Sequence, residues 1–167
     1  MEELLNYSRP VKIDKNPSDI SEILQEVIGR YRNMPEAHVA MRLFGAESIP
    51  PINVDRNKIH QVLLNIVENA IQHSGDQPEI DIFLEYLSLS YPPEIQIVIK
   101  DHGSGINPDI LPRIFDPFFT TRSRGTGLGL SIVRKVVHDH GGRIAVESHP
   151  GIGTTFRISL PVHHVDL

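Results

Sequence analysis

The residues with the clearest chemical potential form a glycine-rich turn at residues 125–130, where the sequence reads GTGLGL. Glycine tolerates positive φ and leaves its N–H group unobstructed, so such a turn at the start of a helix can bind an anion, with phosphate favoured. The alternative is a turn kept for packing, since the segment lacks the ending of a P-loop and the spacing of a dinucleotide-binding turn. The candidate phosphate-binding residues are Gly125, Thr126, Gly127, Leu128, Gly129 and Leu130.

Asn65 and Asn69 lie four residues apart in a segment whose apolar residues repeat like the core face of a helix. Together with Gln72 and His73 they form a separate polar stripe. Asparagine is a poor helix former, whereas two adjacent amide oxygens suit a Mg²⁺ ion that keeps several waters and also binds phosphates. Taken alone, the polar stripe fits a cation site and an ordinary surface helix about equally well. Beside a phosphate-binding turn, the cation site is favoured.

Asp101 continues the alternation of the isoleucines in residues 95–99, so it is expected on the core face of the same strand. A buried carboxylate needs a partner, which can be a protein group or a ligand donor such as an adenine amino group. The alternative is an Asx turn into the glycines that follow. Gly103 and Gly105 allow a sharp backbone turn beneath whatever Asp101 binds.

Residues 106–124 show no periodic element longer than about one turn, which is typical of a lid or a binding loop. We call this segment the lid. Its phenylalanines, Phe115, Phe118 and Phe119, are expected to anchor it, while its polar end reaches phosphate oxygens. The alternative is a loop with its own small core and solvated arginines. The polar residues of the lid are Thr120, Thr121, Arg122 and Arg124.

The elements that must position these residues follow from hydrophobic periodicity. The expected order is helix, strand, helix, two strands, lid, helix and two strands, which is typical of an α+β sandwich with helices on one face of a mixed sheet. The expected elements are a helix capped near Ser18, a strand at 39–43, a helix capped by Asp55 or Asn57, strands at 80–84 and 95–99, a helix from the glycine turn to 141–142, and strands at 144–146 and 156–160.

Composition predicts one soluble domain, because 167 residues with 40% hydrophobic content can bury a core. A net charge of −5 without a basic stripe argues against a nucleic-acid partner. The sequence has no apolar run of the roughly 20 residues that cross a bilayer, and its first residues lack the basic and then apolar layout expected of a signal peptide. It also lacks cysteine, which excludes disulfides and thiolate metal sites. We therefore expect a cytoplasmic domain without direct membrane contact, although a longer parent protein could be membrane-anchored.

Five ordered motifs between about residues 18 and 162 resemble the catalytic and ATP-binding domain of sensor histidine kinases. This superfamily also holds gyrase-type, MutL-type and chaperone ATPases. The resemblance implies a Bergerat-type two-layer α/β sandwich, with three main helices on a mixed sheet and an ATP lid. The motifs are the N box NIVENA at 65–70, the first glycine box DHGSGI at 101–106, the F box IFDPFF at 114–119, the second glycine box at 125–130 and a further glycine box GIGTTF at 151–156.

This resemblance implies that Asn69, with Asn65, binds Mg²⁺ and that Asp101 binds the adenine amino group. It places Asn65, Asn69 and Arg122 in the catalytic machinery. The other residues that it implies in nucleotide binding are Gly103, Gly105, Ile106, Gln72, His73, Phe115, Thr120, Thr121, Arg124, Thr154 and those of the second glycine box.

The sequence departs from the family pattern at two places. Many members have Lys and then an aromatic residue where this chain has Gln72 and His73, so one phosphate-directed charge is missing unless His73 or Arg122 replaces it. Hydrolytic members have a glutamate at the position of Asn65, and an amide cannot act as a general base. Phosphoryl transfer to a protein is therefore favoured over fast hydrolysis.

The implied function is transfer of the ATP γ-phosphoryl group to a histidine of a separate dimerisation domain, with a response regulator downstream. None of the nine histidines lies in the motif of an acceptor. We interpret residues 1–17 as the end of the acceptor hairpin and a linker, 18–162 as the catalytic domain and 163–167 as a tail. Alternatives are an anti-sigma-type serine kinase, a nucleotide-dependent partner-binding switch and a hydrolytic ATPase.

Overall fold

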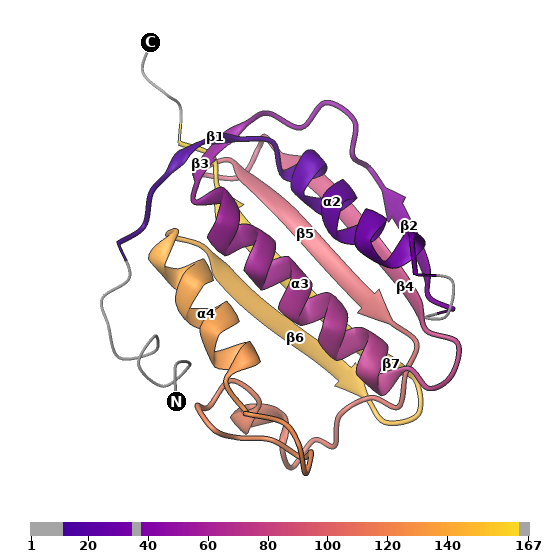
Figure 1. Ribbon diagram of the computed structural model, residues 1–167. Coiled ribbons are helices and arrows are strands. Elements are labelled where there is room, and N and C mark those ends of the chain that lie inside the picture. The colour runs from indigo at the N-terminus through magenta and orange to yellow at the C-terminus, as the bar shows by residue number, and fades with distance from the viewer. Residues whose placement is uncertain (1–11, 35–37, 164–167) are drawn as a thin grey trace.

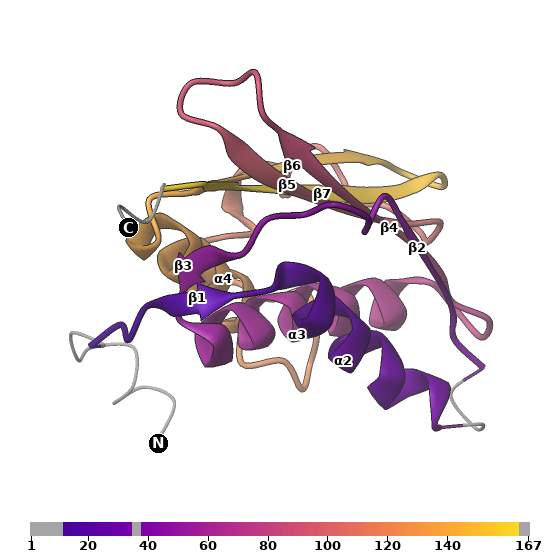
Figure 2. The ribbon, with the colours of Figure 1, turned by 90° about the horizontal axis from the view of Figure 1, so that it is seen from above.

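The computed structural model describes residues 12–34 and 38–163. Three helices cover one face of a five-stranded sheet, so the molecule has two layers (Figures 1 and 2). The predicted α+β sandwich is confirmed. The elements are β1 (Asn16–Ser18), α2 (Ile20–Arg32), β2 (Ala40–Phe44), β3 (Ile52–Val54), α3 (Arg56–His73), β4 (Glu79–Leu87), β5 (Glu94–Asp101), η2 (Leu111–Arg113), α4 (Gly129–Asp139), β6 (Arg143–His149) and β7 (Gly153–Pro161).

The main sheet has the strand order β2-β4-β5-β7-β6. Strand β2 pairs parallel with β4, and the remaining neighbours pair antiparallel, so β4 with β5 and β6 with β7 form two hairpins. A second, two-stranded sheet joins β1 to β3 and was not predicted. Three-residue strands are too short to show alternation, and Pro17 lies inside one of them. Of residues 1–17, which we interpret as the end of the acceptor hairpin and a linker, residues 1–11 lie outside the described residues.

The core lies between the helices and the inner face of the sheet. From Ile80 to Leu84 in β4, and from Ile95 to Asp101 in β5, every second residue is buried, as the alternation of isoleucine and leucine predicts. On the helices, the buried side chains form stripes that face the same sheet. This packing fixes the end of β5, where Asp101 lies. Within residues 12–34 and 38–163, no helix has both the length and the apolar character needed to cross a membrane.

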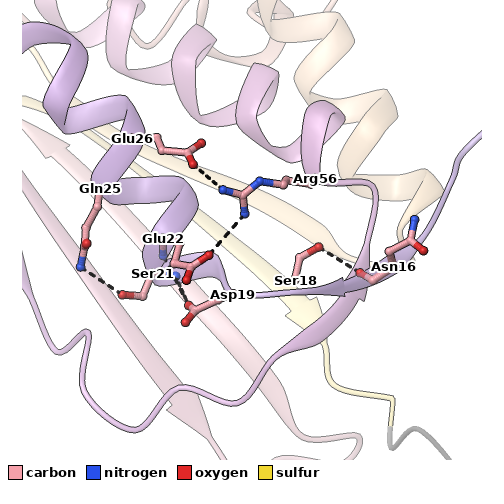
Figure 3. Close-up of polar contacts among 8 residues, drawn as sticks. All are labelled: Asn16, Ser18, Asp19, Ser21, Glu22, Gln25, Glu26 and Arg56. Atoms are coloured by element: carbon pink, nitrogen blue, oxygen red, sulfur yellow. Dashed lines mark hydrogen bonds and ion pairs between the residues drawn. The ribbon is translucent and has the colours of Figure 1, made fainter.

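Helix α2 is capped by Asp19 rather than by Ser18, as Figure 3 shows. The Oδ1 atom of Asp19 accepts hydrogen bonds from the backbone N–H groups of Ser21, at 2.8 Å, and Glu22, at 3.4 Å. The hydroxyl of Ser18 instead donates to the backbone oxygen of Asn16, at 3.0 Å, inside β1. The prediction placed the cap one residue too early because both residue types are good caps.

The N-terminal ends of α2 and α3 are joined by ion pairs of Arg56 with Glu22 and Glu26 (Figure 3). These side chains are largely exposed, so each pair contributes little to stability. Asp55 caps α3 by accepting a hydrogen bond from the N–H of Lys58, at 3.1 Å, which decides between the two predicted caps. The cap therefore fixes the residue at which α3 begins.

A buried histidine connects the end of α4 to the start of α3. His140 is 3% exposed, and its Nδ1 donates to the backbone oxygen of Val136, at 2.7 Å. Its Nε2 accepts a hydrogen bond from the backbone N–H of Asp55, at 3.0 Å. A neutral imidazole with its proton on Nδ1 satisfies both contacts. The histidine therefore has a structural role.

We expect His140→Ala to lower the free energy of unfolding by about 2 to 3 kcal/mol, because it leaves the Asp55 N–H unpaired and opens a cavity. Urea unfolding of the purified chain measures this change. His138→Ala, an exposed histidine on the same helix, is the matched control and should change stability by less than about 0.5 kcal/mol. Equal effects of the two substitutions would contradict the structural role of His140.

Candidate functional site

A cleft of about 410 Å³ opens between α3, the end of β5, the lid and the start of α4. Its size is typical of small-molecule sites. It brings together residues from four of the sequence motifs and Thr154 from the last one. The predicted site residues that line it are Asn65, Asn69, Gln72, His73, Asp101, Ile106, Thr120, Thr121, Arg122, Arg124, Gly125, Thr126, Gly127, Leu128, Gly129, Leu130 and Thr154.

Three of the predicted site residues, Gly103, Gly105 and Phe115, are not among the residues that line the cleft. A Cβ atom on Gly103 would lie 2.2 Å from the backbone oxygen of His73, so only glycine allows the β5 end to approach α3 this closely. Phe115 is buried and packs edge-on against Phe156, with 6.4 Å between ring centroids. These residues shape the walls of the cleft.

Several lining residues were not predicted as site residues. Gln61 and Glu68 lie one helical turn on either side of Asn65, so the helical period could have identified them. The others are apolar and look like ordinary core residues in the sequence. The missed lining residues are Gln61, Glu68, Ile110, Ile114, Phe119 and Ile132.

Asp101 forms the polar floor of the cleft at the end of β5. It is 3% exposed, as its place in the alternation predicts. Its Oδ1 accepts hydrogen bonds from the N–H groups of Gly103, at 2.9 Å, and Thr154, at 3.2 Å. Among the described residues, these are the hydrogen bonds to its side chain, and both use Oδ1. The Asx turn therefore exists, and Oδ2 remains available to accept a hydrogen bond from a ligand in the cleft.

Burial raises the pKa of the Asp101 carboxyl above the usual aspartate value, because desolvation disfavours the charged form. The hydrogen bonds from Gly103 and Thr154, and the nearby His73 and His102, partly offset this effect. A carboxyl with a raised pKa in a cleft is typical of a functional site.

The raised pKa of Asp101 predicts how stability depends on pH. The penalty for burying the charge is absent below the pKa of the unfolded chain and reaches its full size above the higher folded pKa. Asp101→Asn should therefore unfold at higher urea than the wild type at neutral pH, and this advantage should shrink as the pH falls through the raised pKa. Urea unfolding of both proteins at several pH values measures it. An advantage that stays constant with pH would contradict the assignment.

The polar stripe of α3 faces the cleft. The Nδ2 of Asn65 donates to the backbone oxygen of Gly129, at 3.4 Å, so its amide oxygen is not used in this contact. His73 donates from Nδ1 to the backbone oxygen of Asn69, at 2.7 Å, which fixes its ring at the end of the stripe. Two amide oxygens one turn apart, with Glu68 beside them, match the oxygen ligands that Mg²⁺ prefers.

The lid is anchored by two of its three phenylalanines. Phe115 is buried under the guanidinium of Arg134, at 5.6 Å from the ring centroid. Phe119 packs against the core and lines the cleft. Phe118 is 54% exposed and has a positive φ of 64°, so the prediction that all three anchor the lid is wrong for this residue. The N–H of Phe118 instead donates to the backbone oxygen of Gly127, at 2.9 Å.

The last two residues of the glycine turn, Gly129 and Leu130, are the first two residues of α4. Gly127 has a φ of 69°, and a Cβ atom there would lie 2.5 Å from the carbonyl carbon of Phe118, so glycine is required where the turn meets the lid. No side chain among the described residues caps the start of α4. The free N–H groups of its first turn, with the positive end of the helix dipole, therefore face the cleft as an anion site.

Arg122 reaches from the lid to α3, where its Nη1 donates to Oε1 of Gln72. Its own backbone N–H donates to Oγ1 of Thr120, at 3.1 Å. Arg122 and Arg124 bring two positive charges to the cleft, opposite the carboxylates of Glu68 and Asp101. The positive charges thus come from the lid and the negative ones from α3 and β5.

The family of histidine kinase-, DNA gyrase B-, and HSP90-like ATPases matches residues 54–164. Sporulation kinase E of Bacillus subtilis (strain 168) is 36% identical over 161 residues, which cover 96% of this chain and 21% of that protein. Sensor histidine kinase ZraS of Escherichia coli (strain K12) is 34% identical over 164 residues, covering 96% of this chain and 34% of that protein. The chain thus spans about a fifth to a third of the length of these relatives.

Solved structures agree with these relatives. The nucleotide-free catalytic domain of histidine kinase ThkA has a TM-score of 0.76 and 31% identity, covering 89% of this chain and 97% of that one. ThkA in complex with the response regulator TrrA has a TM-score of 0.78 and 30% identity, and the match covers 97% of this chain and 46% of that one. Full-length ShkA in complex with AMPPNP has a TM-score of 0.78 and 25% identity, and the match covers 93% of this chain and 33% of that one. The chain therefore belongs to the histidine kinase-, DNA gyrase B- and HSP90-like ATPase family, as a catalytic domain of the sensor histidine kinase type.

Proposed function

We propose that the cleft binds ATP together with Mg²⁺, and that the chain transfers the γ-phosphoryl group to a histidine of a separate dimerisation domain. The observation that carries this proposal is the convergence of complementary groups on one cleft. A buried carboxylate with a free oxygen lies at its floor, two amides lie on α3, and arginines and free N–H groups lie at the lid and the start of α4. The adenine base, the Mg²⁺ ion and the phosphates of Mg·ATP therefore each have a matching group.

In this proposal, Asp101 selects the base. Its Oδ2 accepts a hydrogen bond from the adenine amino group, while Gly103 and Thr154 hold Oδ1 and fix the orientation of the carboxylate. Ile106 lies in the same lining and offers apolar contact to the base. Because both protein donors bind the same oxygen, the carboxylate is oriented before the nucleotide arrives.

The amide oxygens of Asn65 and Asn69 are the groups that would hold Mg²⁺. The fit rests on their position one turn apart on the cleft side of α3 and on the neutral charge of both ligands, which suits an ion that also binds phosphates. When bound, the ion would supply neutralisation of the phosphate charge.

The phosphates are assigned to the lid and to the start of α4. Arg122 and Arg124 supply planar groups with several N–H donors, and Thr120 and Thr121 add hydroxyls. The first-turn N–H groups of α4 add the positive end of the helix dipole. Phosphoryl transfer depends chiefly on positioning and on charge stabilisation, which these groups provide.

Transfer is favoured over hydrolysis because Asn65 stands where hydrolytic members have a glutamate, and an amide cannot act as the base that activates water. Glu68 is tied to α2, since its Oε1 accepts from the hydroxyl of Tyr31, at 3.5 Å. Burial and this carboxylate raise the pKa of the Tyr31 hydroxyl. An acceptor imidazole depends less on a general base than water does, because the imidazole is itself the nucleophile.

We propose two partners, the dimerisation and phosphoacceptor domain of the same kinase and a response regulator. Support for the second comes from the similar kinase ThkA, whose structure contains the response regulator TrrA. The cytoplasm, where ATP is available, is the proposed location of the domain.

The test is a phosphotransfer assay. The chain is incubated with radiolabelled ATP, Mg²⁺ and the acceptor hairpins of sporulation kinase E and ZraS, each also prepared with its acceptor histidine replaced by glutamine. We expect acid-labile label on a hairpin that retains its histidine. Acid-stable label on serine, or release of free phosphate alone, would contradict histidine transfer and support the serine kinase or the hydrolytic ATPase.

A further inference from the structure

We infer that Gln72 is a positioning residue, which holds the guanidinium of Arg122 against α3 so that the lid supplies the positive charge that this helix lacks. The inference rests on the proposed function, because it assumes that the cleft holds a nucleoside triphosphate. It assigns a role to a residue at which this sequence departs from the lysine of many family members.

The contact between Gln72 and Arg122 crosses the cleft. The two residues are 50 positions apart in the chain, and both line the cleft. Gln72 lies three residues after Asn69, hence on the same face of α3 and one turn further along. Its amide oxygen therefore lies beside the proposed Mg²⁺ ligands, where a phosphate-directed charge is needed.

The main chain of Arg122 is held as well. Its N–H donates to Oγ1 of Thr120, at 3.1 Å, and its carbonyl oxygen accepts from the N–H of Gly125, at 3.4 Å. A Cβ atom on Gly125 would lie 2.6 Å from Oγ1 of Thr120, so the turn closes tightly. With its backbone in a tight turn and its guanidinium bound to Gln72, the long side chain is ordered at both ends.

The charges explain why a neutral amide suits this position. Among the described residues of α3 that line the cleft, none is a lysine or an arginine, and Glu68 is negative. A carboxylate in place of Gln72 would bind Arg122 but cancel its charge. The amide oxygen uses a single N–H of a guanidinium that has five, and the remaining donors stay available for phosphate oxygens. Arg122 is thus oriented without being neutralised.

The test compares Gln72→Ala with the wild type by calorimetric titration with AMPPNP and with adenosine, both in Mg²⁺. We expect about a tenfold loss of AMPPNP affinity, the usual value of a hydrogen bond to a charged group, and no change for adenosine, which lacks phosphates. Arg122→Ala should lose at least as much, and the double variant no more than Arg122→Ala alone. Gln25→Ala, an exposed glutamine of α2, is the matched control and should bind like the wild type.

Unchanged adenosine binding shows that Gln72→Ala is folded, which removes misfolding as an explanation. An unchanged AMPPNP affinity, or full additivity with Arg122→Ala, would overturn the inference. A higher AMPPNP affinity would overturn it too, because the contact would then be a latch that the nucleotide displaces. If the wild type itself binds no AMPPNP, the proposed function fails, which is a distinct result.

Discussion

Asp101→Asn is expected to lower the affinity of the chain for AMPPNP at least about a hundredfold while the protein stays folded. Asparagine keeps an oxygen for the N–H groups of Gly103 and Thr154. It replaces the free Oδ2 by an amide that donates, so the adenine amino group would face another donor. Sites that are built around one hydrogen bond reject a mismatched partner strongly because the buried groups are left unpaired.

Two measurements separate this effect from a loss of structure. Urea unfolding at neutral pH should show Asp101→Asn to be more stable than the wild type, since the variant no longer buries a charge. Asp81→Asn removes a carboxylate of the neighbouring strand that binds Arg42, at 2.6 Å, outside the cleft. This control should bind AMPPNP like the wild type. Equal binding by the wild type and Asp101→Asn would refute the adenine assignment.

Asn69→Ala is expected to reduce phosphotransfer to an acceptor hairpin at least about a hundredfold, because a bound divalent cation contributes several kcal/mol to stabilising the charge of the transition state. The variant should also lose the dependence of nucleotide affinity on Mg²⁺. In the wild type, AMPPNP should bind more tightly with Mg²⁺ than with EDTA. In Asn69→Ala, the two affinities should be similar.

Asn57→Ala is the matched control, since Asn57 is exposed in the first turn of the same helix. It should retain both the rate and the Mg²⁺ dependence. If Asn69→Ala kept the Mg²⁺ dependence of the wild type, the ion would have to be held by other groups, and the assignment of the α3 amides would be wrong.

Much of the fold could be predicted because its long elements have clear periods. The alternation along β4 and β5 identified both strands and placed Asp101 on the buried face. The strands β1 and β3 were not predicted, because three residues are too few to show an alternating pattern and because the two strands come from distant segments of the chain. The cap of α2 was placed one residue early because Ser18 and Asp19 are equally suitable residue types, and only the contact of Ser18 with Asn16 decides between them.

The candidate site was predictable where a residue type was unusual for its position, as with asparagines inside a helix. Apolar lining residues such as Ile110 and Ile132 gave no such signal, since they look like core residues. The exposure of Phe118 could not be predicted either, because three phenylalanines of one loop look alike in the sequence. The contact of Gln72 with Arg122 depends on how the lid folds back over α3.

The central claim, that this cleft binds ATP, is tested most directly by an NMR titration of the 18.8 kDa chain with AMPPNP in Mg²⁺. We expect saturable shifts of backbone amides that line the cleft, those of Asn69, Asp101, Gly127, Gly129 and Thr154 among them. Little change is expected along β2 and β6, at the edges of the sheet. Shifts centred on another surface, or no saturable shifts at millimolar AMPPNP, would contradict the claim.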